Sequence, residues 1–123
     1  MRIVIAGCRE YTDFEEASVF ILSCLVRLGI ETAVVLSGKC RGADKLGERF
    51  ATERGWRILE FPADWAKYGR AAGPVRNRKM VDASDAVICF WDGKSRGTAS
   101  LIQYAKKLKR PLFIKYITIK SPD

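Results

Sequence analysis

The sequence contains no histidine, and its four cysteines show no CxxC spacing. The first absence excludes Ser-His-Asp and Cys-His catalysis, and every zinc site with a histidine ligand, from a single chain. The second gives no sign of a dithiol redox motif or a zinc knuckle. We therefore expect Cys8, Cys24, Cys40 and Cys89 to serve as small buried hydrophobic residues.

Long hydrophobic runs are also missing, because no apolar stretch approaches the ~18 residues that would span a bilayer. Met1 leads directly into the apolar run 2–7, which leaves no room for a secretory signal. The chain has no linker, repeat or charge block. These features predict a cytoplasmic protein with one domain over residues 1–118, a short polar tail at 119–123, and no membrane partner.

Positive charge exceeds negative charge, with 22 Lys and Arg residues against 14 Asp and Glu residues and a net charge of +8. Hydrophobic residues make up 48% of the chain, which excludes a wholly disordered protein. The excess of positive charge favours an anionic partner.

Buried-strand patterns alternate with amphipathic helical patterns along the chain. The first expected helix opens at a capping box, either Thr12/Glu15 or Asp13/Glu16, and closes at Gly29. Pro74 is expected at the first position of the third helix. The predicted strands are 2–8, 33–38, 57–61, 85–91 and 112–117, and the other predicted helices are 43–55, 74–84 and 97–109. This order predicts an α/β fold: a single three-layer Rossmann-like domain with a mostly parallel five-stranded sheet and helices on both faces.

Basic residues gather after the ends of the predicted strands, where open α/β sheets bind their ligands. A long segment after the third strand, with Pro62, Gly69 and Gly73, is also too long for a plain connector. Ten of the 22 basic residues fall at this rim: Arg9, Lys39, Arg41, Lys67, Arg70, Arg76, Arg78, Lys79, Lys94 and Arg96.

Two glycine-rich turns at this rim each lead from a strand into a helix, at 37–44 and at 92–98. Glycine allows the backbone to approach a phosphate, and the free N–H groups at a helix start favour an anion. Neither turn is a Walker A or GxGxxG motif, so a P-loop NTPase or a standard dinucleotide oxidoreductase is not indicated. The alternative is that the glycines only make tight turns and the arginines are solvated.

Four motifs in this order, at 37–44, 62–65, 73–80 and 90–98, resemble the YspA-like branch of the SLOG superfamily. That superfamily groups Rossmann-like domains related to the Lonely-guy phosphoribohydrolases, the Smf/DprA proteins and the molybdenum-cofactor carrier proteins. The resemblance covers nearly the whole chain. It implies a site for nucleotides or nucleotide-derived ligands, with sensing or processing of such ligands in some members, and it implies a homo-oligomer.

The turn at 92–98 is similar to the Lonely-guy phosphate motif, in which a glutamate follows GGxGT. Gly93, Gly97 and Thr98 match, whereas the glutamate position holds Leu101. Arg76 falls where those hydrolases carry a catalytic arginine. The resemblance therefore implies ligand binding more strongly than phosphoribohydrolase activity by the family's own mechanism.

Other carboxylates remain candidates for the missing acid. Asp64 and Asp44 could act there or could contact a ribose or a base, whereas they could instead order their loop and helix. Glu48 is a third candidate for the acid, but it is expected to be a surface residue. Trp65 and Tyr68 could stack on a base or pack over the sheet edge.

These observations predict a sensing or sequestering module that binds a phosphorylated, nucleotide-derived ligand such as an ADP-ribose-like molecule. One alternative is a hydrolase of a nucleotide N-glycosidic or phosphate bond that uses Asp64 and Arg76, and another is single-stranded nucleic-acid binding. Two options stay open for cofactors: none, or a divalent metal that accompanies the phosphate. The predicted ligand-binding residues are Gly7, Arg9, Ser37, Gly38, Lys39, Arg41, Gly42, Asp44, Asp64, Trp65, Arg76, Asn77, Gly93, Ser95, Arg96, Gly97 and Thr98.

Overall fold

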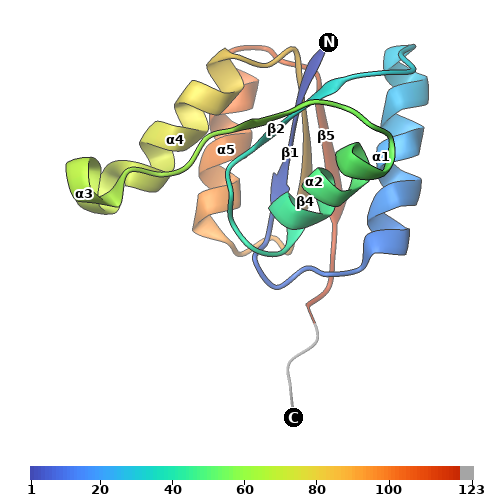
Figure 1. Ribbon diagram of the computed structural model, residues 1–123. Helices are drawn as coiled ribbons and strands as arrows, with labels where there is room; N and C mark the ends of the chain where they lie inside the picture. The colour runs from blue at the N-terminus through green and yellow to red at the C-terminus, as the bar shows by residue number, and fades with distance from the viewer. Residues whose placement is uncertain (120–123) are drawn as a thin grey trace.

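The five predicted strands form one sheet in which every neighbouring pair is parallel, in the order β3-β2-β1-β4-β5. The structure is a computed structural model that describes residues 1–119 (Figure 1). Its elements are β1 (Arg2–Gly7), α1 (Phe14–Leu28), β2 (Val34–Ser37), α2 (Ala43–Glu53), β3 (Ile58–Glu60), α3 (Trp65–Tyr68), a 3-10 turn η1 (Gly69–Ala71), α4 (Ala72–Asp82), β4 (Ala86–Trp91), α5 (Arg96–Lys107) and β5 (Leu112–Tyr116).

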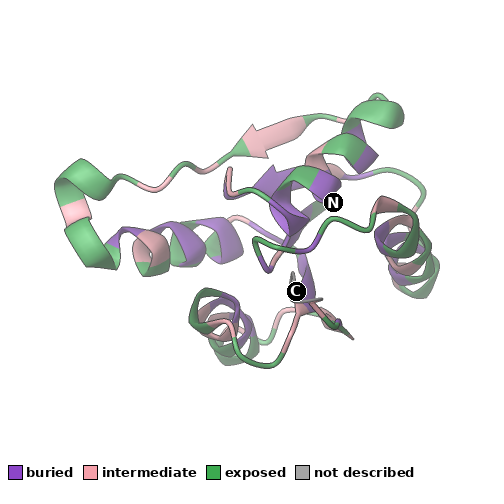
Figure 2. Cartoon of the chain, turned by 90° about the horizontal axis from the view of Figure 1, so that it is seen from below, coloured by how far each residue is buried: buried purple, intermediate pink, exposed green. Residues whose placement is uncertain are grey.

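Helices cover both faces of the sheet, so the predicted three-layer arrangement is confirmed (Figure 1). Successive side chains of a strand point to opposite faces. Ile3 and Ile5 of β1 therefore pack with α1 and α2, while Val4 and Ala6 pack with α4 and α5. Figure 2 shows the result: buried residues on the central strands and on the inward sides of the helices, with exposed residues outside.

The segment between β3 and β4 differs most from the sequence-based expectation. Residues 65–71 form α3 and η1, which were not predicted, because four- and three-residue helical turns carry no amphipathic period. Helix α4 begins at Ala72, so Pro74 is its third residue and not its first as predicted. Proline is tolerated there because N–H groups of the first helical turn have no partner within the helix.

Asp13 caps α1, which decides between the two predicted capping boxes. Its carboxylate accepts the N–H of Glu16 at 3.0 Å. We expect Asp13→Ala to lower the free energy of unfolding by about 1 kcal/mol, because that N–H would lose its partner. Thr12→Ala, the control from the other box, is expected to change it by less than about 0.5 kcal/mol. Urea titrations of both variants measure the difference, and equal losses would contradict Asp13 as the cap.

The cysteines largely follow the expectation. Cys8, Cys24 and Cys89 are buried free thiols, and Cys40 is a partly exposed free thiol. Among residues 1–119, no helix combines the length and the apolar character needed to cross a membrane. Apart from Ile119, the predicted polar tail lies outside the described residues.

Candidate functional site

A cavity of about 410 Å³ lies where the chain reverses its direction of travel across the sheet, between β1 and β4. The carboxyl ends of adjacent strands diverge into helices on opposite faces at such a point, which is where ligands bind in open α/β sheets. All neighbouring strands of the sheet are parallel, so their carboxyl ends lie at the same edge. Of the predicted site residues, this switch-point cavity brings together Gly7, Arg9, Asp44, Arg76, Asn77, Ser95, Gly97 and Thr98.

Glycine holds the backbone tightly at two places beside the switch-point cavity. A Cβ atom at Gly7 would overlap the carbonyl of Phe90, and one at Gly42 would overlap the carbonyl oxygens of Cys8 and Arg9. Both glycines have positive φ, 153° and 74°. Two backbone hydrogen bonds hold the same segment. The Cys8 carbonyl accepts the N–H of Ala43 at 3.1 Å, and the Cys8 N–H donates to the Phe90 carbonyl at 3.0 Å. The turn after β1, with Arg9, is thereby pressed against β4 and the start of α2.

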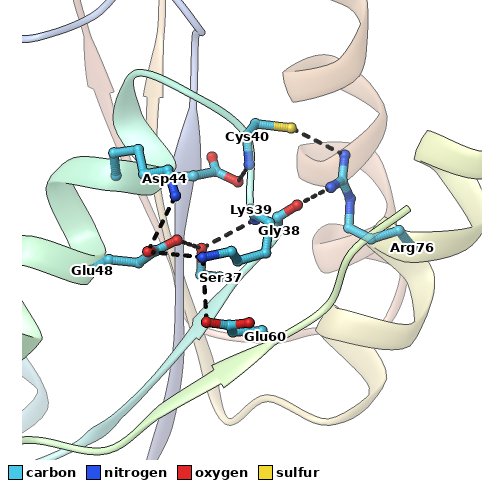
Figure 3. A network of polar contacts seen from close by, with 9 residues as sticks. Ser37, Gly38, Lys39, Cys40, Asp44, Glu48, Glu60 and Arg76 are labelled. Atoms are coloured by element: carbon cyan, nitrogen blue, oxygen red, sulfur yellow. Dashed lines mark hydrogen bonds and ion pairs between the residues drawn. The ribbon is translucent and has the colours of Figure 1, made fainter. Parts of the chain in front are cut away.

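Asp44 carries the buried carboxyl group of the switch-point cavity, with a relative exposure of 3%. Its Oδ2 accepts the N–H of Cys40 at 3.3 Å (Figure 3). Burial raises the pKa of Asp44 to about 6, although backbone hydrogen bonds from Cys40 and Gly7 and the charge of Arg76 act in the opposite direction. The cavity therefore contains a group that changes its charge just below neutral pH.

Arg76 and Asn77 on α4 connect three segments around the cavity. The Arg76 guanidinium donates to the Gly38 carbonyl and, at 3.6 Å, to the Cys40 sulfur (Figure 3). Its Nε donates to Asn77 Oδ1 at 2.9 Å, and Asn77 Nδ2 donates to the Gly97 carbonyl at 3.2 Å. Arg76 is therefore partly a positioning residue, since several of its donors hold the loop after β2.

The first turn of α5 faces the switch-point cavity without a side-chain cap. Asp92 accepts the N–H groups of Lys94 and Ser95, both at 2.9 Å, which shapes the turn that precedes the helix. Those two hydrogen bonds lower the pKa of Asp92. Ser95 stands at the cap position but makes no capping hydrogen bond, and the first turn contains no acidic residue. Its N–H groups at Gly97 and Thr98 therefore remain suited to an anion.

Ser37 and Lys39 belong to a separate polar network behind the loop after β2. Ser37 donates to Glu48, and the Lys39 ammonium lies 3.3 Å from both Glu48 and Glu60 (Figure 3). Burial alone would raise the pKa of Glu48, but the Ser37 hydrogen bond and the nearby lysines lower it. Glu48 is only partly exposed because it is the centre of this network, so the predicted surface position of that residue is wrong.

The remaining predicted residues occupy different positions. Gly38, Lys39, Arg41 and Trp65 line a second cavity of about 380 Å³. Asp64 is exposed and caps α3, where it accepts the N–H of Lys67 at 3.0 Å. The switch-point cavity does not include Ser37, Gly42, Gly93 or Arg96 among its described lining residues.

Several cavity residues were not among the predicted ligand-binding residues. Met80, Leu101 and Ile119 form its apolar part, and Cys8, Cys40, Glu10 and Asp92 add further polar or sulfur groups. Leu101 is buried at the position where the Lonely-guy motif has its glutamate, so that position faces the cavity as an apolar side chain. Across residues 1–119, no three Cys, Asp or Glu side chains are grouped so that they could hold a metal ion.

Comparison with known proteins finds similarity in both sequence and structure. A sequence model of the YAcAr family, described as the YspA, cpYpsA-related SLOG family, matches residues 1–68. The Gene 61 protein of Mycobacterium phage D29 is 35% identical over 85 residues, which cover 64% of this chain and 68% of that protein.

A solved structure of DNA processing protein A from Helicobacter pylori has a TM-score of 0.62 and 22% sequence identity to this chain. The match covers all of this chain and 68% of that one. That structure was described for its single-stranded DNA binding mode. The likeness confirms the Rossmann-like α/β fold.

Proposed function

Because the chain belongs to the YspA, cpYpsA-related SLOG family, we propose that it binds a phosphorylated, nucleotide-derived small molecule in the switch-point cavity. The proposed ligand is an ADP-ribose-like molecule, and the proposed role of the protein is to sense or sequester it. The family membership fits a ligand-binding role. The nucleotide character of the ligand is our proposal, and it rests on the chemistry of the cavity.

The observation that carries the proposal is the convergence of anion-binding groups on one cavity of suitable size. The uncapped first turn of α5 and the side chains of Arg9 and Arg76 line the same volume of about 410 Å³. Ligand pockets commonly measure about 300–1,000 Å³ and combine apolar walls with a few polar groups. Here Met80, Leu101 and Ile119 supply the apolar wall on which a ribose or base can pack.

The proposal predicts that Gly97→Leu weakens nucleotide binding without harming the fold. A Cβ at Gly97 meets no atom within 4 Å, and leucine is a better helix former than glycine, so stability should stay equal or rise slightly. The added side chain occupies space where the phosphate would meet the N–H groups of α5. Calorimetric titration with AMP and ADP-ribose is expected to show a dissociation constant for Gly97→Leu that is at least tenfold larger than that of the unmodified protein.

Gln103→Leu is the matched control, because it introduces the same side chain on the exposed surface of the same helix, outside the cavity. It should bind like the unmodified protein. If AMP, ADP-ribose and cyclic nucleotides all fail to bind the unmodified protein saturably, that result would contradict the proposed function. Equal affinities for Gly97→Leu and Gln103→Leu would exclude the first turn of α5 as the phosphate site.

A second candidate function is single-stranded DNA binding. It is supported by the fold shared with DNA processing protein A from Helicobacter pylori, together with the net charge of +8. Fluorescence anisotropy with a labelled oligothymidylate tests this candidate. The affinity of the protein for the oligothymidylate would fall steeply with added salt, because phosphate contacts release counterions.

A further inference from the structure

The second cavity, of about 380 Å³, adjoins the switch-point cavity. Arg9, Cys40 and Arg76 line both volumes, so these three residues form the boundary between them. Each cavity has a size suited to part of a small molecule. A ligand longer than a mononucleotide could therefore extend across the boundary.

The charged side chains of the second cavity are mostly neutralised within the protein. The Lys39 ammonium pairs with Glu48 and Glu60, and Arg41 pairs with Glu10. The Arg76 guanidinium already donates to the Gly38 carbonyl. The interior of the second cavity therefore offers less to a phosphate than the uncapped first turn of α5 does.

An aromatic surface is what the second cavity offers instead. Trp65, the first residue of α3, is 55% exposed although tryptophan is among the most costly side chains to leave in water. Its ring edge lies 3.9 Å from the Cβ position of Gly73 on α4, so α4 supports it from one side. An exposed indole beside a cavity is suited to stacking on a nucleic base.

Arg9 lies on the boundary between the two cavities and is exposed. Within residues 1–119, its side chain makes no hydrogen bond or ion pair, unlike those of Lys39, Arg41 and Arg76. A guanidinium with all five donors unused can bind two phosphate oxygens at once. The boundary is therefore the place where a phosphate link between two nucleosides would be recognised.

We infer that the two cavities together bind a ligand made of two nucleosides joined through phosphate, with the second base stacked on Trp65 and the link held by Arg9. This inference rests on the proposed function, because the first nucleoside occupies the switch-point cavity. It adds the class of ligand and a second subsite. A ligand with one base would leave the second cavity unfilled.

The test compares ADP-ribose with diadenosine diphosphate, which has the same adenosine and diphosphate but carries an adenine on its second ribose. Calorimetric titration of the full chain is expected to show about tenfold tighter binding of diadenosine diphosphate, the effect of one stacked base. Trp65→Ala should remove this difference, because the second base loses its stacking partner, whereas Trp65→Phe should keep most of it. Tyr116→Ala is the control, since Tyr116 is exposed outside both cavities.

Equal affinity of the unmodified protein for the two ligands would overturn the second subsite while leaving the proposed function intact. A loss of affinity for both ligands in Trp65→Ala would also overturn it, because Trp65 would then not discriminate the second base. If neither ligand binds the unmodified protein, the proposed function fails and the second subsite fails with it.

Discussion

Replacing Gly42 by alanine is expected to lower the free energy of unfolding by about 3 kcal/mol or more. Gly42 has φ 74° and ψ −126°, a backbone conformation that side chains of L-amino acids rarely adopt. A Cβ atom there would also overlap the carbonyl oxygens of Cys8 and Arg9. The overlapping atoms are backbone, so relief requires the turn after β1 to move away from α2.

Gly29→Ala is the matched control for this experiment. Gly29 also has positive φ, 69°, at the end of α1, but a Cβ there meets no atom within 4 Å. Gly29→Ala should therefore lower the free energy of unfolding only by the strain of the left-handed backbone, about 1–2 kcal/mol. Denaturant titrations of the two variants measure both costs, and equal losses would show that the turn after β1 is not packed against Gly42.

Asp44→Asn is expected to become more stable relative to the unmodified protein by about 3 kcal/mol as the pH rises from 3 to 7. Burial raises the pKa of Asp44 from its ordinary value near 3.8 to about 6. The native state therefore binds the proton more tightly than the unfolded state does. Stability from the protonated carboxyl is fully present below pH 4 and is lost as the pH rises to about 6, whereas asparagine does not titrate.

Asp92→Asn provides a control of opposite sign. Backbone hydrogen bonds lower the pKa of Asp92, so its carboxylate stabilises the native state above its ordinary pKa. This variant should lose stability relative to the unmodified protein as the pH rises. Chemical unfolding at several pH values between 3 and 7 measures both. A difference between Asp44→Asn and the unmodified protein that stays constant over this range would contradict the raised pKa.

Much of the fold could be predicted from the sequence, because buried parallel strands and amphipathic helices have distinct patterns. The continuous apolar runs of β1 and β4 and the stripe of α1 are examples. The strand order could not be predicted in this way. The pairing of Ile3 with Ala86 joins segments far apart in the chain, and no local pattern specifies it. The short helix α3 is too brief to show a period.

The candidate site was predictable in outline but not in the orientation of each side chain. The glycines and cations at the strand ends indicated the edge of the sheet at which the switch-point cavity lies, and Arg76 and Thr98 line that cavity. Ser37, which was predicted to be a ligand-binding residue, instead donates its hydroxyl hydrogen to Glu48. Its orientation depends on a partner on α2, which the sequence does not place beside it.

Asn77 joins Arg76 to the carbonyl of Gly97, and Arg76 joins that pair to the loop after β2. The width of the switch-point cavity is therefore set by hydrogen bonds within the protein and does not depend on a ligand. If the proposed ligand binds there, a preorganised cavity of this kind would lose little conformational entropy on association. Under the proposed function, selectivity would come from the fit between a ligand and a cavity whose width these hydrogen bonds fix in advance.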